Sequence, residues 1–172
     1  MRNPRRDSLE GSANRTVLGG LAVSLLTSVH HYYGAHVYKT PWRRHAAPVS
    51  GLATAIALGS LLALRRRTTG LADAVAFWVL TADTLVVHVG GFGVFEGAYN
   101  HVLKDALYLG GASPALLRRL FPAPRYELPD DAFFEVTGVL QVIPAAITGY
   151  YLYRLVQERL SGVGAAGNPQ PA

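Results

Sequence analysis

The chain contains no cysteine, and only 16% of its 172 residues are charged. The absence of cysteine excludes disulfides, thiolate catalysis, zinc fingers and iron–sulfur clusters with the usual cysteine ligation. A soluble domain of ordinary composition carries about 25% charged residues. Because 50% of this chain is hydrophobic, the low charged fraction indicates a membrane protein.

The chain also lacks the common catalytic signatures, since it contains no G-x-S-x-G, P-loop, H-E-x-x-H or G-x-G-x-x-G pattern. Its net charge of +5 comes mainly from arginines beside apolar runs, which is typical of juxtamembrane segments. No basic face with interleaved aromatics is present, so we expect no nucleic-acid partner. The expected partner is the lipid bilayer, and a membrane protein or a second copy of this chain stays open.

Hydropathy predicts an all-α integral membrane protein with four spans, at residues 16–35, 49–64, 71–91 and 132–155. We expect these spans to form an up-down-up-down four-helix bundle. A short amphipathic segment, 95–121, lies between the third and fourth spans. The polar ends, 1–15 and 160–172, are predicted to be a flexible basic tail and a disordered tail.

An even number of spans places both chain ends on the same side of the membrane. The predicted side of the termini carries slightly more lysine and arginine than the opposite side. The positive-inside rule therefore favours cytoplasmic termini, in a cytoplasmic or plasma membrane.

The third span contains a cluster of glycines at its end. A continuous helix over residues 71–109 would be ~58 Å long, far longer than a ~30 Å hydrocarbon core. Gly90, Gly91 and Gly93 weaken the helix there, so we expect a bend that lays residues 95–109 along the membrane surface. Within an α-helical span, Asp83 and His88 are about 140° apart and should face different partners.

Ionisable groups at membrane depth are costly unless they are paired, so they mark a candidate functional site. Small residues and His31 share one face of the first span, which predicts that His31 points into the bundle while His30 lies about 100° away. His31 and His88 fall ~22 and ~26 Å from the cytoplasmic ends of their spans. Glu135 starts the fourth span near the same level, and the amphipathic segment could add Glu96 and His101.

Two site chemistries fit this coincidence of depth. In one, His31 and His88 are the axial ligands of a b-type haem. In the other, a non-haem transition metal is held by histidine and carboxylate ligands that suit iron, zinc, copper or manganese; the candidate ligands are His30, His31, His88 and Glu135. Glu96, His101 and Glu135 are candidates for further ligation, catalysis or proton transfer. The predicted function is a haem- or metal-binding membrane redox protein or subunit.

The alternative is a non-catalytic membrane subunit, or a lipid or small-molecule binder, whose polar residues only hold helices together. Interhelical hydrogen bonds in membranes contribute about 0.6–2 kcal/mol each. Asp83 is either such a packing group, bonded to a serine or threonine of another span, or part of a proton relay. A transporter ranks lower, because the chain shows no paired discontinuous spans.

Overall fold

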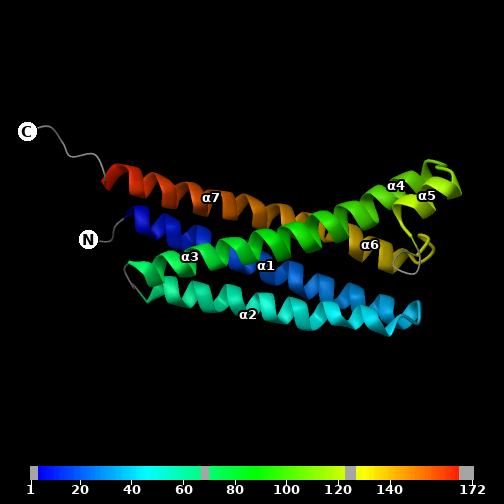
Figure 1. The fold of residues 1–172 in the computed structure, drawn as a ribbon, viewed down its shortest axis with the longest axis horizontal. Coiled ribbons are helices and arrows are strands. Elements are labelled where there is room, and N and C mark those ends of the chain that lie inside the picture. The colour runs from blue at the N-terminus through cyan, green and yellow to red at the C-terminus, as the bar shows by residue number, and fades with distance from the viewer. Residues whose placement is uncertain (1–3, 67–69, 123–126, 167–172) are drawn as a thin grey trace, which may run out of the picture.

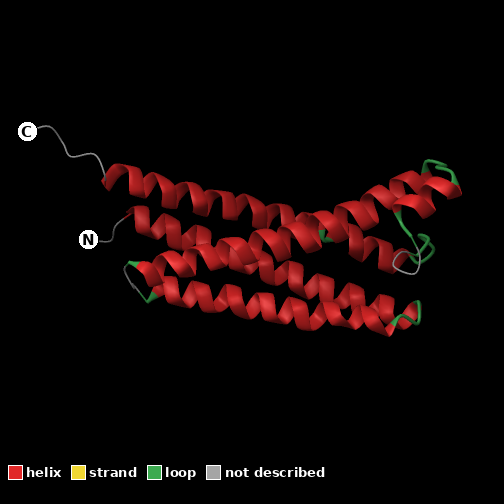
Figure 2. Ribbon diagram, in the orientation of Figure 1, coloured by secondary structure: helices red, strands yellow, loops and turns green. Residues whose placement is uncertain are grey.

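The computed structural model describes residues 4–66, 70–122 and 127–166, which are helical apart from short connections and contain no strand (Figures 1 and 2). The first helix, α1, spans Pro4–Val37. A 3₁₀ turn, η1 (Pro41–His45), leads into α2 (Ala46–Arg65). The remaining elements are α3 (Leu71–Asp83), η2 (Thr84–Leu103), α4 (Lys104–Leu109), α5 (Pro114–Leu120), α6 (Ala132–Leu140) and α7 (Val142–Ala166).

Three helical stretches are long and apolar enough to cross a membrane, namely Pro41–Arg65, Leu71–Leu109 and Ala132–Ser161. The protein is therefore an all-helical chain whose composition is consistent with a membrane location. The helix α1 is not among the three. It lies between α2 and α7 (Figure 1) and also contacts η2 and α6.

The two ends of the bundle differ in what they bury. An apolar core lies at the end that carries both chain termini (Figure 1), and it includes Val17, Leu61, Phe77 and Leu155. The opposite half buries polar side chains instead, among them His30, His101 and Glu135. This half holds the candidate site.

The N-terminal segment differs from the predicted flexible tail, because α1 is helical from Pro4 onward. Neighbouring helices hold this first stretch in place. Ser8 donates a 2.8 Å hydrogen bond to Glu158 of α7, and Arg65 of α2 donates a 2.7 Å bond to Asn14. The helix α7 likewise continues to Ala166, beyond the predicted end of the fourth span, and residues 167–172 lie outside the described part of the chain.

The predicted bend at Gly90–Gly93 is not present, since Leu71–Leu109 forms one continuous helix (Figure 1). Its middle part, η2, is wound as a π-helix, in which each N–H bonds to the carbonyl five residues earlier. Gly93 has a packing role instead: a Cβ atom at this position would overlap Ala145 of α7. The glycine therefore allows two helices to approach closely.

The last predicted span is interrupted just before Pro144. Helix α6 ends at Leu140 and α7 begins at Val142, with Gln141 in a turn between them. Pro144 has no N–H, and its ring crowds the carbonyl four residues earlier, which belongs to Leu140. The start of α6 is capped by Asp131, whose carboxylate accepts a 2.9 Å hydrogen bond from the Phe134 N–H.

Candidate functional site

The π-helical winding of η2 brings residues four and five apart to one face. The buried residues of η2 are Thr84, His88, Gly93, Gly97, Asn100 and His101. Most of them are four or five positions apart, on average more than the about 3.6 residues per turn of an α-helix. As a result, Glu96 Oε1 lies 3.7 Å from His101 Nε2. Asp83 Oδ2 also lies 3.7 Å from His88 Nδ1, so the prediction that Asp83 and His88 face different directions is wrong.

Helix α1 brings two adjacent histidines to the same glutamate. His30 Nε2 lies 3.5 Å from Glu96 Oε1, and His31 Nε2 lies 3.3 Å from the same oxygen. His30 Nε2 also lies 3.1 Å from His101 Nε2. His30 has an exposed fraction of 0%, so both histidines reach the interior, rather than His31 alone.

We call His30, Glu96 and His101 the His–Glu cluster, because one ligand atom from each lies within 4.8 Å of the others. The separations of 3.1, 3.5 and 3.7 Å put all three atoms about 2.0 Å from a common central point. Zinc, for comparison, binds histidine nitrogen and carboxylate oxygen at about 2.0–2.2 Å. The cluster therefore has the dimensions of a three-ligand metal site.

The orientation of His101 is set by two groups outside the cluster. Its Nδ1 lies 2.6 Å from Glu135 Oε2, and Lys104 Nζ donates a 2.8 Å bond to Glu135 Oε1. Because Lys104 is a buried cation, its partner Glu135 is ionised and accepts the Nδ1 proton of His101. In the neutral imidazole, the Nε2 lone pair of His101 then points into the cluster. A carboxylate behind the histidine in this way is the usual outer shell of a metal ligand.

His30 is oriented by a threonine of α6. The Thr137 hydroxyl donates a 2.8 Å bond to the Phe133 carbonyl, so it accepts the 3.0 Å bond from His30 Nδ1. In the neutral imidazole, His30 Nε2 then carries a lone pair as well. With both rings neutral, two nitrogen lone pairs face each other at 3.1 Å, so the arrangement needs a cation between them or an additional proton on one ring.

Close packing holds both imidazole rings in position. The Phe134 ring stacks on His30 with a centroid distance of 4.1 Å. On the other side of Phe134, a Cβ atom at Gly34 would overlap its ring. Gly138 of α6 lies directly against the His101 ring, where any Cβ atom would overlap it. The rings therefore have little freedom to turn away from the cluster.

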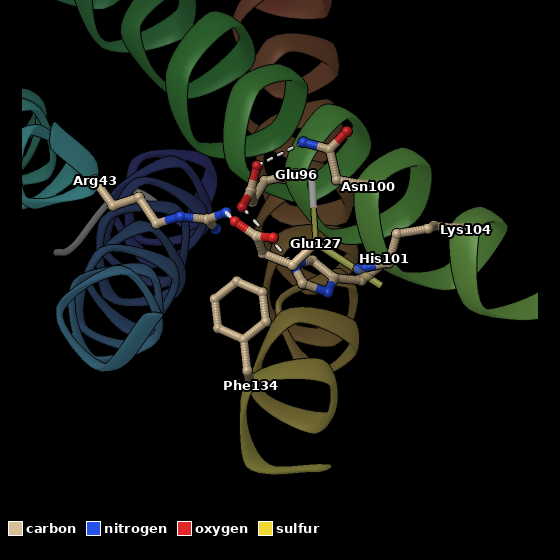
Figure 3. Close-up of a pocket in the computed structure, with 7 residues that line it drawn as sticks. All are labelled: Arg43, Glu96, Asn100, His101, Lys104, Glu127 and Phe134. Carbon is tan, nitrogen blue, oxygen red and sulfur yellow. Dashed lines mark hydrogen bonds and ion pairs between the residues drawn. The ribbon is translucent and has the colours of Figure 1, made fainter. Parts of the chain in front are cut away.

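A small polar cavity adjoins the cluster (Figure 3), lined by Arg43, Glu96, Asn100, His101, Lys104, Glu127 and Phe134. Its volume is about 20 Å³, enough for one water-sized molecule. Asn100 donates a 2.7 Å hydrogen bond to Glu96 Oε2, which leaves Oε1 for the histidines. The cluster thus has room for one further small ligand beside His101 and Glu96.

Two tyrosines near the end of α1 tie it to the start of α6. Tyr33 donates a 3.0 Å bond to Asp131, and Tyr38 donates a 2.9 Å bond to Asp130. Burial, together with the bond to Asp130, raises the pKa of Tyr38 above its usual range. Tyr38 therefore remains a neutral hydrogen-bond donor throughout the physiological pH range, and the connection keeps His30 next to Thr137.

His88 lies in a different environment from the cluster. Its Nε2 atom is 3.2 Å from the Ser24 hydroxyl, and its ring packs against Gly20. Ser24 precedes His31 by seven residues, about 10 Å along an α-helix. The structure therefore does not bring His31 and His88 together as a facing pair. Among the described residues, Asp83 Oδ2 has no hydrogen-bond partner, so no Ser or Thr bond to this oxygen is found.

The predicted residues thus fall into new groups. Glu96 and His101, predicted as catalytic or additional groups, belong to the His–Glu cluster, whereas Glu135 lies behind His101. The sequence did not identify Lys104 as the partner that orients Glu135, nor Thr137 as the partner of His30. One signal was present: the spacing of five residues between a carboxylate and a histidine occurs twice on one helix.

The fold and the cluster define an all-helical protein with membrane-length apolar helices and a buried histidine–glutamate group. Comparison of the chain with protein-family models, with curated proteins and with solved structures finds no match.

Proposed function

We propose that this chain is a four-span membrane protein that binds one non-haem iron(II) ion in the His–Glu cluster and uses it as a redox centre. The observation that carries the proposal is the convergence of His30 Nε2 and His101 Nε2, 3.1 Å apart, on Glu96 Oε1. A metal ion satisfies all three atoms at once.

The fourth span in this proposal is α1. Its outward side chains are apolar, since Leu18, Leu25 and Val29 are more than half exposed. Its inward face is mixed and includes the fully buried Thr16 and Thr27 beside the buried Val17 and Val23. Apolar residues outside and polar residues inside are what a helix needs when lipid is its solvent and other helices surround its polar face.

The proposed topology is an up-down-up-down bundle of α1, α2, the helix 71–109 and the broken helix α6–α7. Both described ends of the chain lie at the same end of the molecule (Figure 1). The excess of lysine and arginine supports the cytoplasm as the side of the termini.

The choice of iron follows from the ligand set. Two histidines and one carboxylate with open positions are typical of non-haem iron(II) centres that react with oxygen. The neighbouring cavity of about 20 Å³ leaves room for a water or a diatomic molecule. Within this chain, Glu135 and Lys104 hold His101 in place and increase its basicity, and Asn100 orients Glu96.

A second candidate function is a membrane subunit whose polar residues only join helices. Bonds between helices favour it, for example the 2.5 Å bond that Thr27 donates to Gln141 and the 3.0 Å bond that Thr54 donates to Ser24. In this case one imidazole of the His30–His101 pair carries an extra proton, and no metal is needed.

Elemental analysis of protein purified in detergent, with an absorption spectrum of the same sample, decides between the two. We expect one iron per chain and no Soret band. His101→Ala should abolish iron binding. His88→Ala is the matched control, because His88 lies on the same helix and is as deeply buried; it should retain the iron. Purified protein without metal would support the second candidate, a Soret band would support haem, and stoichiometric zinc would contradict the redox role.

A further inference from the structure

A larger cavity lies beside the small polar one. Its volume is about 400 Å³, within the range of about 300–1,000 Å³ for small-molecule sites. Most of its lining is apolar, from α4, α5 and the segment before α6, and includes Tyr108, Leu117, Phe121 and Leu128. We call it the α5 pocket.

The α5 pocket is connected to the His–Glu cluster through shared residues. Lys104 and Glu127 line both the α5 pocket and the small polar cavity. Lys104 in turn binds Glu135, which binds His101. A molecule in the α5 pocket would therefore have one end beside the outer shell of the cluster.

The charged groups around the α5 pocket favour an anionic head group. Arg118 and Lys104 are its cations, Lys104 being already bound to Glu135 outside the pocket, and Glu127 is its only acid. Glu127 Oε1 lies 3.5 Å from Arg43 Nη2, so it is already paired outside the pocket. Within the described part of the chain, Arg118 has no ion pair. Its guanidinium is available for a carboxylate, which it can bind with two parallel hydrogen bonds.

The rim of the α5 pocket suits entry from a bilayer. Leu128, which lines the pocket, is 60% exposed, and Leu109, at the end of α4 and outside the lining, is 81% exposed. Helix α5 itself has apolar and basic faces, a composition typical of helices that lie at a membrane interface. An apolar chain can therefore reach the pocket without crossing water.

We propose that the α5 pocket binds a single-chain lipid carboxylate, with the carboxylate at Arg118 and Lys104 and the chain along Leu117, Phe121 and Leu128. This assignment rests on the proposed function, because it names the class of substrate that the pocket presents to the metal centre. The modest volume favours one acyl chain over a two-chain phospholipid.

The test is equilibrium binding of radiolabelled oleate to the protein in phosphatidylcholine nanodiscs, with empty nanodiscs subtracted. We expect saturable binding that Arg118→Gln weakens at least fivefold. Arg119→Gln is the matched control, because Arg119 is the adjacent arginine of α5 but does not line the pocket; it should leave binding unchanged. Leu117→Trp, which fills the pocket, should also abolish binding.

Oleyl alcohol and dioleoyl phosphatidate test the head group and the chain number. Both should compete with oleate at least fivefold more weakly than unlabelled oleate does. Equal competition by oleyl alcohol would overturn the role of the carboxylate, and equal competition by phosphatidate would overturn the single-chain assignment. Equal effects of Arg118→Gln and Arg119→Gln would overturn the location.

Metal analysis of the same samples separates this inference from the proposed function. Iron without saturable oleate binding overturns the pocket and leaves the metal site intact. Oleate binding that depends on Arg118 but occurs without any metal supports the pocket and overturns the proposed function.

Discussion

The helix Leu71–Leu109 carries two carboxylate–histidine pairs of the same design. Asp83 and His88 are five residues apart, as are Glu96 and His101, and each pair has an oxygen–nitrogen distance of 3.7 Å. The surroundings of the two pairs differ. Opposite Glu96–His101, helix α1 presents His30 and His31, whereas opposite Asp83–His88 it presents a glycine and a serine.

The comparison indicates that the helix Leu71–Leu109 by itself supplies only carboxylate–histidine pairs. Further potential ligands must come from neighbouring helices. The Glu96–His101 pair gains a further imidazole from α1 and an orienting carboxylate, Glu135, from α6. The Asp83–His88 pair gains only the hydroxyl of Ser24, and the facing atoms of both residues have no hydrogen-bond partner in the described structure. The Glu96–His101 pair is therefore the candidate site, because more potential ligand atoms surround it than surround the Asp83–His88 pair.

The largest difference between the two pairs is expected when each carboxylate is removed in turn. Glu96→Ala should lose essentially all bound metal, because Glu96 Oε1 lies within 3.7 Å of three imidazoles. Asp83→Ala should retain the metal of the native protein. Elemental analysis of purified variants measures this, and equal retention in both would remove the distinction between the pairs.

The next largest effect is expected when the packing around the His101 ring is changed. Gly138→Ala forces the His101 ring to move, because the added Cβ atom overlaps it; overpacking of this kind costs about 1–3 kcal/mol. We expect a lower Tm and more than tenfold weaker metal binding. Gly149→Ala, later in the same broken helix, meets only ordinary contacts with Val89 at 3.7 Å and should change neither quantity.

The outer partner of His30 should have a smaller effect. Thr137→Val keeps the shape of the side chain but removes the acceptor for His30 Nδ1, and loss of such an outer-shell partner typically weakens metal binding by about 10–100-fold. We expect the lower end of this range in a metal competition titration. Thr148→Val is the control, because its hydroxyl donates only to the Pro144 carbonyl; a similar loss there would point to a general effect on packing.

The smallest effect concerns the pair without further ligands. Ser24→Ala removes the hydroxyl that contacts His88 Nε2 and accepts a bond from Thr54, and interhelical hydrogen bonds of this kind contribute about 0.6 kcal/mol each. Thermal unfolding in detergent should show a Tm lower by a few degrees, with metal content unchanged. A clear loss of metal would mean that the two pairs are coupled.

The sequence predicted the helical class, because long apolar runs indicate helical spans. Asp131 caps α6, and Ser113 caps α5 through a 3.3 Å bond from the Leu116 N–H; such caps follow local rules, because these side chains act within their own turn. All the residues of the His–Glu cluster were also named in advance. Their polar character within apolar surroundings was visible in the sequence.

Their pairing and roles could not be predicted, because they depend on the winding of η2 and on contacts between helices. With α-helical geometry, Glu96 and His101 would be about 140° apart, so nothing local placed them together. Glu135 was expected as a ligand, but Lys104 and His101 occupy its two oxygens. The role of Thr137 arises only where α6 packs against α1.

The geometry of the His–Glu cluster depends on the π-helical winding of η2. If residues 84–103 rewound as an α-helix, Glu96 would rotate away from His101, and the three-atom site would vanish although every side chain remained. Any ion that requires all three atoms therefore stabilises the wider winding by its own binding free energy. Ion binding and the winding of residues 84–103 are then thermodynamically coupled, so that a change in one shifts the other.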